Sequence, residues 1–344
     1  MSASLHFGYL ETNEAASLYL LSNSKGTTVG ISDLGATLVL CRVADAKGHL
    51  TDVLLGHSNA SDYLGDSYCL GFVVGRNANR IANATFDFGG KTYHLATNDG
   101  PNNLHSGPGF WAHRIWKVLE ASNSSITLEL QSPSGDQGFP GSATAQVSYS
   151  LSEDDRLTVS YLVTPSEPTI INLTNHAYWN LNGHTSGGVL DHTLQIEAQS
   201  YTPLVDHLPT GQICPVEGTP YNFRRARAIG ACLEELPDGY DDNFCLENHG
   251  ELAQAARLCG DASGIVMDVL TDAPGMQIYT DRTFSVPNGR DGHSYGAFAG
   301  IALETQYYPD AVNHENFPQP VFTPEHPFES TTVFAFSTDR AQQA

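Results

Sequence analysis

Apolar and polar residues alternate with a period of two along much of the chain, the spacing expected of strands that bury one face. Residues 145–151 and 157–163 alternate in this way on either side of the turn-like residues 152–155, which predicts a β-hairpin. Helical periodicity is scarce: the segment 250–259 has helical propensity, but its brevity leaves it ambiguous. Further strand candidates are residues 126–130, 193–198, 265–270, 277–280, 299–303 and 332–337.

Turn-forming residues separate these strands, with 32 glycines and 18 prolines spread through the chain. Many short strands joined by tight turns predict an all-β sandwich or barrel. At 344 residues the chain exceeds the usual domain length of roughly 150, but large all-β domains do so routinely. Because no Pro/Ser/Gly-rich linker or charge run marks a boundary, we predict a single domain over residues 1–344.

The charge balance is strongly acidic, with 38 Asp and Glu against 16 Lys and Arg and a net charge of −22. Such a surface repels phosphate backbones and anionic lipid, so we expect neither nucleic acid nor a membrane as a partner. The six cysteines lie far apart with no C-x-x-C pair, which indicates reduced thiols. With no basic leader and no apolar run of about 18 residues, the predicted location is cytoplasmic. The sequence does not determine the oligomeric state.

Residues 170–181 carry the first candidate for chemistry, because apolar β-formers give way there to amides, aromatics and His176. Imidazole titrates near neutrality, amides bind hydroxyls, and aromatic faces pack against the C–H face of a sugar ring. The alternative for His176 alone is a buried histidine beside core aromatics. A second segment, residues 302–314, places Glu304 at the end of an apolar run and supplies a matching carboxylate.

Two polar loops complete the candidate site, residues 75–81 after an apolar strand and the turn-rich residues 98–107. Each alone is also explained as an ordinary turn with a surface arginine. Motifs for serine hydrolases, P-loops, dinucleotide folds and zincins are absent from the sequence, and the fourteen histidines lack carboxylates at metal-ligand spacing. We therefore predict a site that uses no metal and no cofactor.

In this order, the segments resemble the signatures of the aldose 1-epimerase (galactose mutarotase) family. They are G-R-N-A-N-R-I (75–81), N-N-L-H-S-G (102–107), N-L-T-N-H-A-Y-W-N-L (172–181), G-Y-D-D-N-F (239–244), M-Q-I-Y-T (276–280) and L-E-T-Q-Y-Y-P-D-A-V-N (303–313). The resemblance covers nearly the whole chain. It implies a large antiparallel β-sandwich of the galactose mutarotase-like supersandwich type, in agreement with the strand pattern.

The resemblance also assigns roles to residues. It implies that His176 is the general acid and Glu304 the general base, and that a small-molecule aldose is the ligand. Sugar-binding roles fall on Asn79, Arg80, His105, Asp241 and Gln277. The chain departs from the pattern at Ser106, where a glycine is expected beside His105. A doubled acid leaves Asp242 as the alternative to Asp241.

Interconversion of α and β anomers needs a base at the C1 hydroxyl and an acid at the ring oxygen. A carboxylate and an imidazolium with pKa values tuned toward neutrality can exchange these roles. We expect His176 and Glu304 to face one cleft on opposite sides of the anomeric centre, about a sugar ring apart. Open alternatives are a hexose-phosphate epimerase, a glycosidase using Asp241 with Glu304, and a non-catalytic sugar-binding or sensing module.

Overall fold

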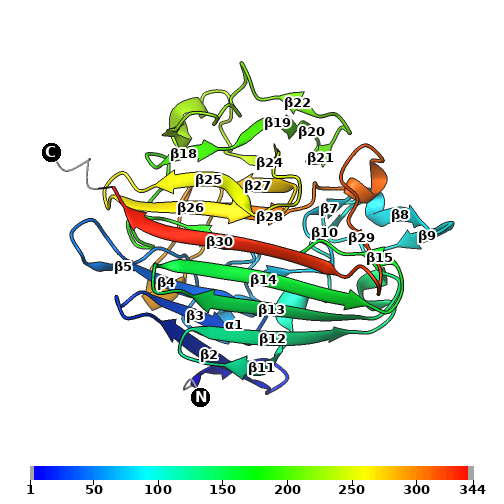
Figure 1. Cartoon of the computed structure of the whole chain (residues 1–344), viewed down its shortest axis with the longest axis horizontal. Helices are drawn as coiled ribbons and strands as arrows, with labels where there is room; N and C mark the ends of the chain where they lie inside the picture. Colours follow the sequence, from blue (N-terminus) through cyan, green and yellow to red (C-terminus); the bar gives the residue numbers. More distant parts are fainter. Residues whose placement is uncertain (1–3, 340–344) are drawn as a thin grey trace.

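The largest sheet has nine antiparallel strands and forms one layer of the molecule (Figure 1). The computed structural model describes residues 4–339. In spatial order the sheet contains β11 (Lys117–Ala121), β12 (Ser125–Ser132), β13 (Ala143–Leu151), β14 (Arg156–Pro165), β30 (Phe328–Thr338), β26 (Ile265–Thr271), β25 (Ala253–Cys259), β18 (Thr193–Ile196) and β23 (Arg227–Ala228). The predicted hairpin is confirmed as β13 and β14, which pair from Ala143–Pro165 to Leu151–Leu157. Within segment 250–259, whose residues have helical propensity, Ala253–Cys259 form strand β25 instead of a helix.

Two further sheets lie behind this layer in Figure 1. The six-stranded sheet contains β17 (Tyr178–Trp179), β28 (Ile301–Gln306), β27 (Gly275–Tyr279), β24 (Asp241–Leu246), β19 (Ala198–Thr202) and β22 (Cys214–Pro215). The five-stranded sheet contains β1 (Ser4–Tyr9), β2 (Ala15–Ser22), β3 (Thr28–Ser32), β4 (Leu38–Ala44) and β5 (Leu50–Asp52). All pairings between named strands in residues 4–339 are antiparallel.

Short elements connect the sheets. Five two-stranded ribbons pair β7 (Arg80–Ile81) with β10 (Asn103–Leu104), β6 (Val73–Val74) with β16 (Thr174–Asn175), β15 (Thr169–Ile170) with β29 (Val321–Phe322), β8 (Thr85–Phe88) with β9 (Lys91–His94), and β20 (Leu204–Val205) with β21 (Leu208–Pro209). Helix is limited to α1 (Ala60–Leu64) and six 3-10 turns within the described residues, at Ala82–Ala84, Trp111–His113, Asp136–Gly138, Ile229–Cys232, Arg290–Gly292 and Ala311–Asn313. In residues 4–339, no helix has the length and apolarity to cross a bilayer.

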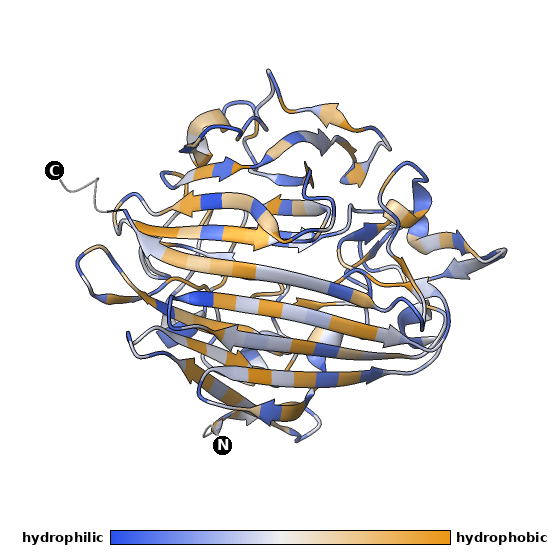
Figure 2. Cartoon of the chain, in the orientation of Figure 1, coloured by the Kyte–Doolittle hydropathy of each residue, from blue (hydrophilic) through white to orange (hydrophobic). Residues whose placement is uncertain are grey.

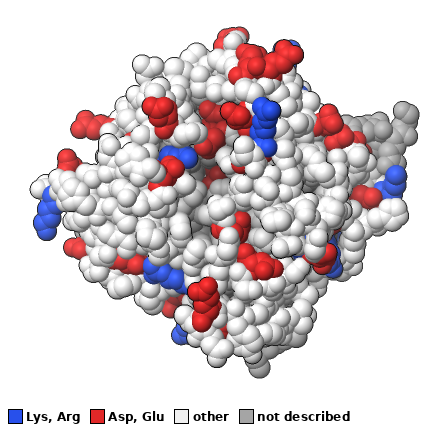
Figure 3. All heavy atoms as spheres, turned by 180° about the vertical axis from the view of Figure 1, so that it is seen from behind, with Lys and Arg blue, Asp and Glu red and all other residues white. Residues whose placement is uncertain are grey.

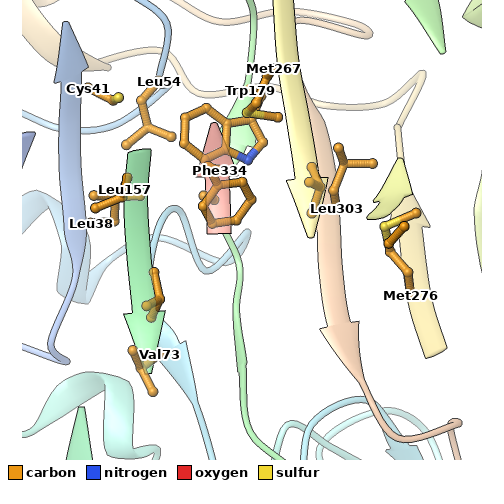
Figure 4. Packing of buried hydrophobic residues seen from close by; sticks show 14 of the residues in the cluster. Leu38, Cys41, Leu54, Val73, Leu157, Trp179, Met267, Met276, Leu303 and Phe334 are labelled. Carbon is orange, nitrogen blue, oxygen red and sulfur yellow. The ribbon is translucent and has the colours of Figure 1, made fainter. Parts of the chain in front are cut away.

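The main core lies between the layers and explains the period-two pattern. Alternate residues of β12, β13 and β14 are buried, and Figure 2 shows the matching alternation of apolar and polar positions along these strands. In the close-up of Figure 4, Trp179 packs beside Phe334, with ring centroids 4.9 Å apart, and Met267 lies next to Trp179. One cluster of buried apolar residues includes members from Leu21 near the start of the chain to Phe336 near its end. The single-domain organisation stays a prediction.

Candidate active site

His176 lies in the loop between β16 and β17 and is fixed there by its backbone. Its N–H donates to the carbonyl of Phe72 and its carbonyl accepts from Gly71, both over 2.9 Å. The imidazole stacks on the ring of Tyr178, with centroids 5.1 Å apart and an interplanar angle of 26°. Residues 170–181 therefore form three short strands rather than one continuous strand, and the interruption places His176 at the site.

Three neighbouring strands place the other polar groups on one face of the six-stranded sheet. Glu304 of β28 pairs with Gln277 of β27, which pairs with Asn243 of β24. Asp241 lies two residues before Asn243, so it shares that face because side chains alternate along a strand. Asp242 points to the opposite side, in register with Ile278 and hence with Leu303, both of which belong to the core.

A cavity of about 110 Å³ opens at this face. His176 and Glu304 both line it, together with four of the predicted sugar-binding residues, Asn79, Arg80, His105 and Asp241. Gln277 is not among the lining residues. It lies behind Asp241, where its Nε2 donates to Asp241 Oδ1 over 2.7 Å.

The imidazole and the carboxyl group are much closer than expected. His176 Nε2 lies 3.4 Å from Glu304 Oε1, and the two residues are 6% and 2% exposed. The expectation of one shared cleft is confirmed, but the expected separation of a sugar ring is wrong. The physical reason is the packing of β17 against β28, which pair directly through Tyr178 and Ala302, each two residues from one of these groups.

Burial controls the proton distribution of this pair. It lowers the pKa of His176 to about 4. It also raises the pKa of Glu304 well above its usual value; the charge of Asp241 raises this pKa further, and the charge of Arg80 lowers it. Desolvation disfavours charge on either group, so burial favours a neutral imidazole beside a protonated carboxyl group. The expected shift toward neutrality is therefore wrong for His176, whose pKa moves away from it.

Arg80 links two carboxylates at the edge of the cavity. Its Nε donates to Asp99 Oδ2 over 2.7 Å, and its Nη1 lies 3.4 Å from Asp241 Oδ2. Burial opposes ionisation of Asp241, but hydrogen bonds and charge from His207, Arg80 and Gln277 outweigh it and lower its pKa. Asp241 is therefore an anionic acceptor facing the cavity, held from several sides.

His105 presents a fixed hydrogen-bond donor. The backbone N–H of Asn79 donates to His105 Nδ1 over 3.1 Å, so Nδ1 carries a lone pair and the neutral ring has its proton on Nε2. Burial, and then His176 and Arg80, lower the pKa of His105 well below its usual value, which keeps the ring neutral. Nε2–H is thus the nitrogen left for a ligand.

The same tautomer bears on metal binding. His105, His176 and Glu304 each place a potential ligand atom within 4.8 Å of the others, and two histidines with a carboxylate are a familiar zinc set. However, a metal ligand needs a lone pair, and the proton of His105 sits on the nitrogen that is free. The donor set fits sugar hydroxyls better than a metal ion.

Sequence reasoning missed several residues that line the cavity. Tyr178, Tyr279 and Leu104 lie inside segments that the sequence singled out, so adjacency to His176, Gln277 and His105 was the available signal. Asp99 also lies inside such a segment, in the turn-rich loop, and acts through Arg80. The remaining lining residues, Ser67, Tyr68 and Cys69, come from a loop with no distinguishing pattern.

An antiparallel sandwich whose cavity holds an imidazole and a carboxyl group in contact, among further hydrogen-bond donors and acceptors, fits an enzyme that acts on a ligand rich in hydroxyl groups, and similarity gives the family. The model of the aldose 1-epimerase family matches residues 17–335. The chain is 39% identical to human galactose mutarotase over 312 residues, 90% of this chain and 91% of that protein. It is 35% identical to the aldose 1-epimerase of Escherichia coli K12, covering 93% and 94%.

Solved structures agree with the sequence similarity. The crystal structure of the GalM/aldose epimerase homologue from C. elegans superposes with a TM-score of 0.89 at 31% identity, covering 94% of this chain and 99% of that one. Galactose 1-epimerase from Lactobacillus acidophilus gives a TM-score of 0.83 at 25% identity, with 99% of each chain covered. The chain belongs to the aldose 1-epimerase family and is an enzyme of the isomerase class.

Proposed function

We propose that the protein interconverts the α and β anomers of free aldohexoses such as galactose and glucose. The observation that carries this proposal is the buried contact between His176 Nε2 and Glu304 Oε1 at 3.4 Å, in a cavity lined by hydroxyl-binding groups. The C1 hydroxyl and the ring oxygen are bonded to the same carbon. A base and an acid in contact can therefore address both oxygens of one bound sugar.

In the proposed reaction Glu304 takes the proton of the C1 hydroxyl while His176 protonates the ring oxygen. The C1–O5 bond breaks, the C1–C2 bond rotates, and the aldehyde closes from its other face with the two roles exchanged. These roles require the pair's proton to sit on His176 in the working form. Arg80 favours that form because it lowers the pKa of Glu304, whereas Asp241 raises the pKa of both His176 and Glu304 and so does not select between them.

The remaining groups are proposed to hold the ring. Asn79, Arg80, His105 and Asp241 line the cavity and offer both donors and acceptors to sugar hydroxyls, while Gln277 fixes Asp241. Fixed hydrogen bonds position the anomeric carbon against the acid–base pair and discriminate among hydroxyl configurations. The sheet register supports Asp241 rather than Asp242 as the residue that contacts the sugar.

A neutral sugar fits the cavity better than a sugar phosphate. Arg80 is the one cation among the lining residues, and two carboxylates already bind it. The basic cluster at residues 224–227 lines a different cavity, with Glu217. Figure 3 shows a face with a hollow near its centre and acidic side chains around it, an arrangement that disfavours anionic ligands.

The test follows the anomers of freshly dissolved α-D-galactose and α-D-glucose by polarimetry or NMR. We expect the protein to accelerate the approach to equilibrium, and His176→Asn and Glu304→Gln each to lower kcat by about 10² to 10⁴-fold. The exposed residues His49 and Glu329 supply matched controls as His49→Asn and Glu329→Gln. A spontaneous rate unaltered by the wild type rules out the activity, and full rates in both variants rule out the assigned roles.

We also propose that the protein acts in the cytoplasm without a nucleic-acid partner. The net charge of −22 and the free state of all six cysteines support this location. Fractionation of cells expressing the full chain tests it, and recovery in a membrane or extracellular fraction contradicts it.

A further inference from the structure

Ser106 occupies a position that suits glycine. Its φ is +59°, and the preceding residue, His105, has a φ of +54°. Two successive residues with side chains in the left-handed region are unfavourable, since a Cβ crowds the backbone there. A glycine at position 106, which the family pattern leads one to expect, would avoid half of this cost. Something else must therefore stabilise the serine in this loop.

The serine hydroxyl is fully buried and bonds twice to one residue of another loop. Its Oγ accepts from the backbone N–H of Asn77 over 2.8 Å and donates to the carbonyl of Asn77 over 3.0 Å. No other hydrogen bond to these two backbone atoms occurs among residues 4–339. A buried N–H or carbonyl without a partner is costly, so the hydroxyl satisfies two groups that glycine would leave unpaired.

These two bonds lie next to the contact that fixes the ring of His105. The backbone N–H of His105 donates to the carbonyl of Asn79 over 3.0 Å, and the N–H of Asn79 donates to His105 Nδ1 over 3.1 Å. Four hydrogen bonds thus join residues 77–79 to residues 105 and 106. The two from Ser106 hold Asn77, only two residues from the donor that sets the tautomer of His105.

We propose that Ser106 is a positioning residue for sugar binding, whose hydroxyl holds the 77–79 segment so that Asn79 keeps His105 Nε2–H directed at the sugar. The inference rests on the proposed function insofar as His105 binds the substrate. It concerns a side chain that does not line the cavity and that acts through another residue. On this proposal, the serine that stands where the family pattern has glycine strengthens the loop beside His105 rather than disturbing it.

Two substitutions separate the hydroxyl from the backbone strain. Ser106→Ala removes both hydrogen bonds and keeps the unfavourable φ, whereas Ser106→Gly removes the bonds and relieves the φ. We expect both variants to raise the KM for α-D-galactose about five-fold while kcat changes less than about two-fold, as for loss of a contact made equally in ground and transition states. The matched control is Ser330→Ala on β30, which removes a buried hydroxyl that donates to Asp272, and it should keep the wild-type KM.

A second measurement reports on His105 directly. The ¹⁵N shifts of its ring should show a single tautomer protonated at Nε2 in the wild type, and a mixture of tautomers in Ser106→Ala and Ser106→Gly. Wild-type KM values and an unchanged tautomer in both variants overturn the proposal. So does an activity loss that tracks the melting temperature and leaves KM unchanged. If the wild type lacks mutarotase activity, the proposed function fails, and the NMR measurement still decides whether Ser106 positions His105.

Discussion

Gln277 and Asp241 are joined across neighbouring strands, with Gln277 Nε2 donating to Asp241 Oδ1 over 2.7 Å. Because Gln277 is 2% exposed and also pairs in register with Glu304, it connects Asp241, the proposed sugar-binding acid, to the strand that carries the proposed base. A residue assigned to the substrate from its motif thus lies behind another residue, and this relationship leads to the first prediction.

Gln277→Ala should weaken substrate binding more than chemistry. Loss of the donor raises the pKa of Asp241 and frees its carboxylate, so we expect KM to rise about ten-fold with a smaller fall in kcat. Steady-state polarimetry over a range of galactose concentrations measures both constants. Gln254→Ala is the control, because Gln254 makes the same kind of bond to Asp268 on the nine-stranded sheet. A fall in kcat alone would place Gln277 in the chemical step.

Arg80→Lys should lower activity even though the substitution retains the positive charge. The guanidinium uses separate nitrogens for Asp99 and Asp241, whereas a single ammonium cannot reproduce that geometry. We expect kcat/KM to fall roughly 10- to 100-fold. Arg257→Lys, at an arginine paired with Asp268 outside the cavity, should leave kcat/KM unchanged. Equal effects of the two substitutions would contradict a special role for Arg80.

The plot of rate against pH should be bell-shaped, because His176 and Glu304 must share a single proton for one to act as acid and the other as base. As pH falls through the pKa of His176, about 4, the pair takes up a second proton, so that both groups are protonated and no base remains. As pH rises through the raised pKa of Glu304, the last proton leaves and no acid remains. Initial rates corrected for the spontaneous reaction at each pH test this expectation. A flat profile across both limbs would exclude the pair as acid and base.

Asp242→Asn should stabilise the protein at neutral and alkaline pH. Burial, and then the charge of Asp241, raise the pKa of Asp242 from 3.8 to about 7. Because the folded state binds this proton more tightly than the unfolded chain, stability is lost as pH rises between these two values and is level above the higher one. The advantage of the asparagine, which does not titrate, should grow over this window by on the order of 4 kcal/mol.

Denaturant unfolding of wild type and Asp242→Asn at pH 4, 6 and 8 measures this advantage. The exposed Asp238 supplies the control as Asp238→Asn, for which no comparable pH-dependent gain is expected. A constant difference between Asp242→Asn and wild type at all three pH values would show that Asp242 does not titrate in this range.

Local pattern predicted the strands well, because alternation is a property of neighbouring residues. The hairpin of residues 145–163 is present as predicted. The segment 250–259 is ambiguous from its sequence, and its residues 253–259 form a strand that pairs with β26. The catalytic candidates were found from segment chemistry and family resemblance. Their contact was not, since the distance between His176 and Glu304 depends on how β17 and β28 pair.

By itself, the sequence determined the all-β class, the acidic surface, the family and the segments that meet at the site. Only the tertiary structure decided that Asp241 rather than Asp242 faces the cavity, that Gln277 lies behind it, and that Ser106 bonds to Asn77. The division has a physical reason. Strand formation and residue type are read over a few neighbours, whereas burial, proton positions and hydrogen bonds arise between residues brought together from distant parts of the chain.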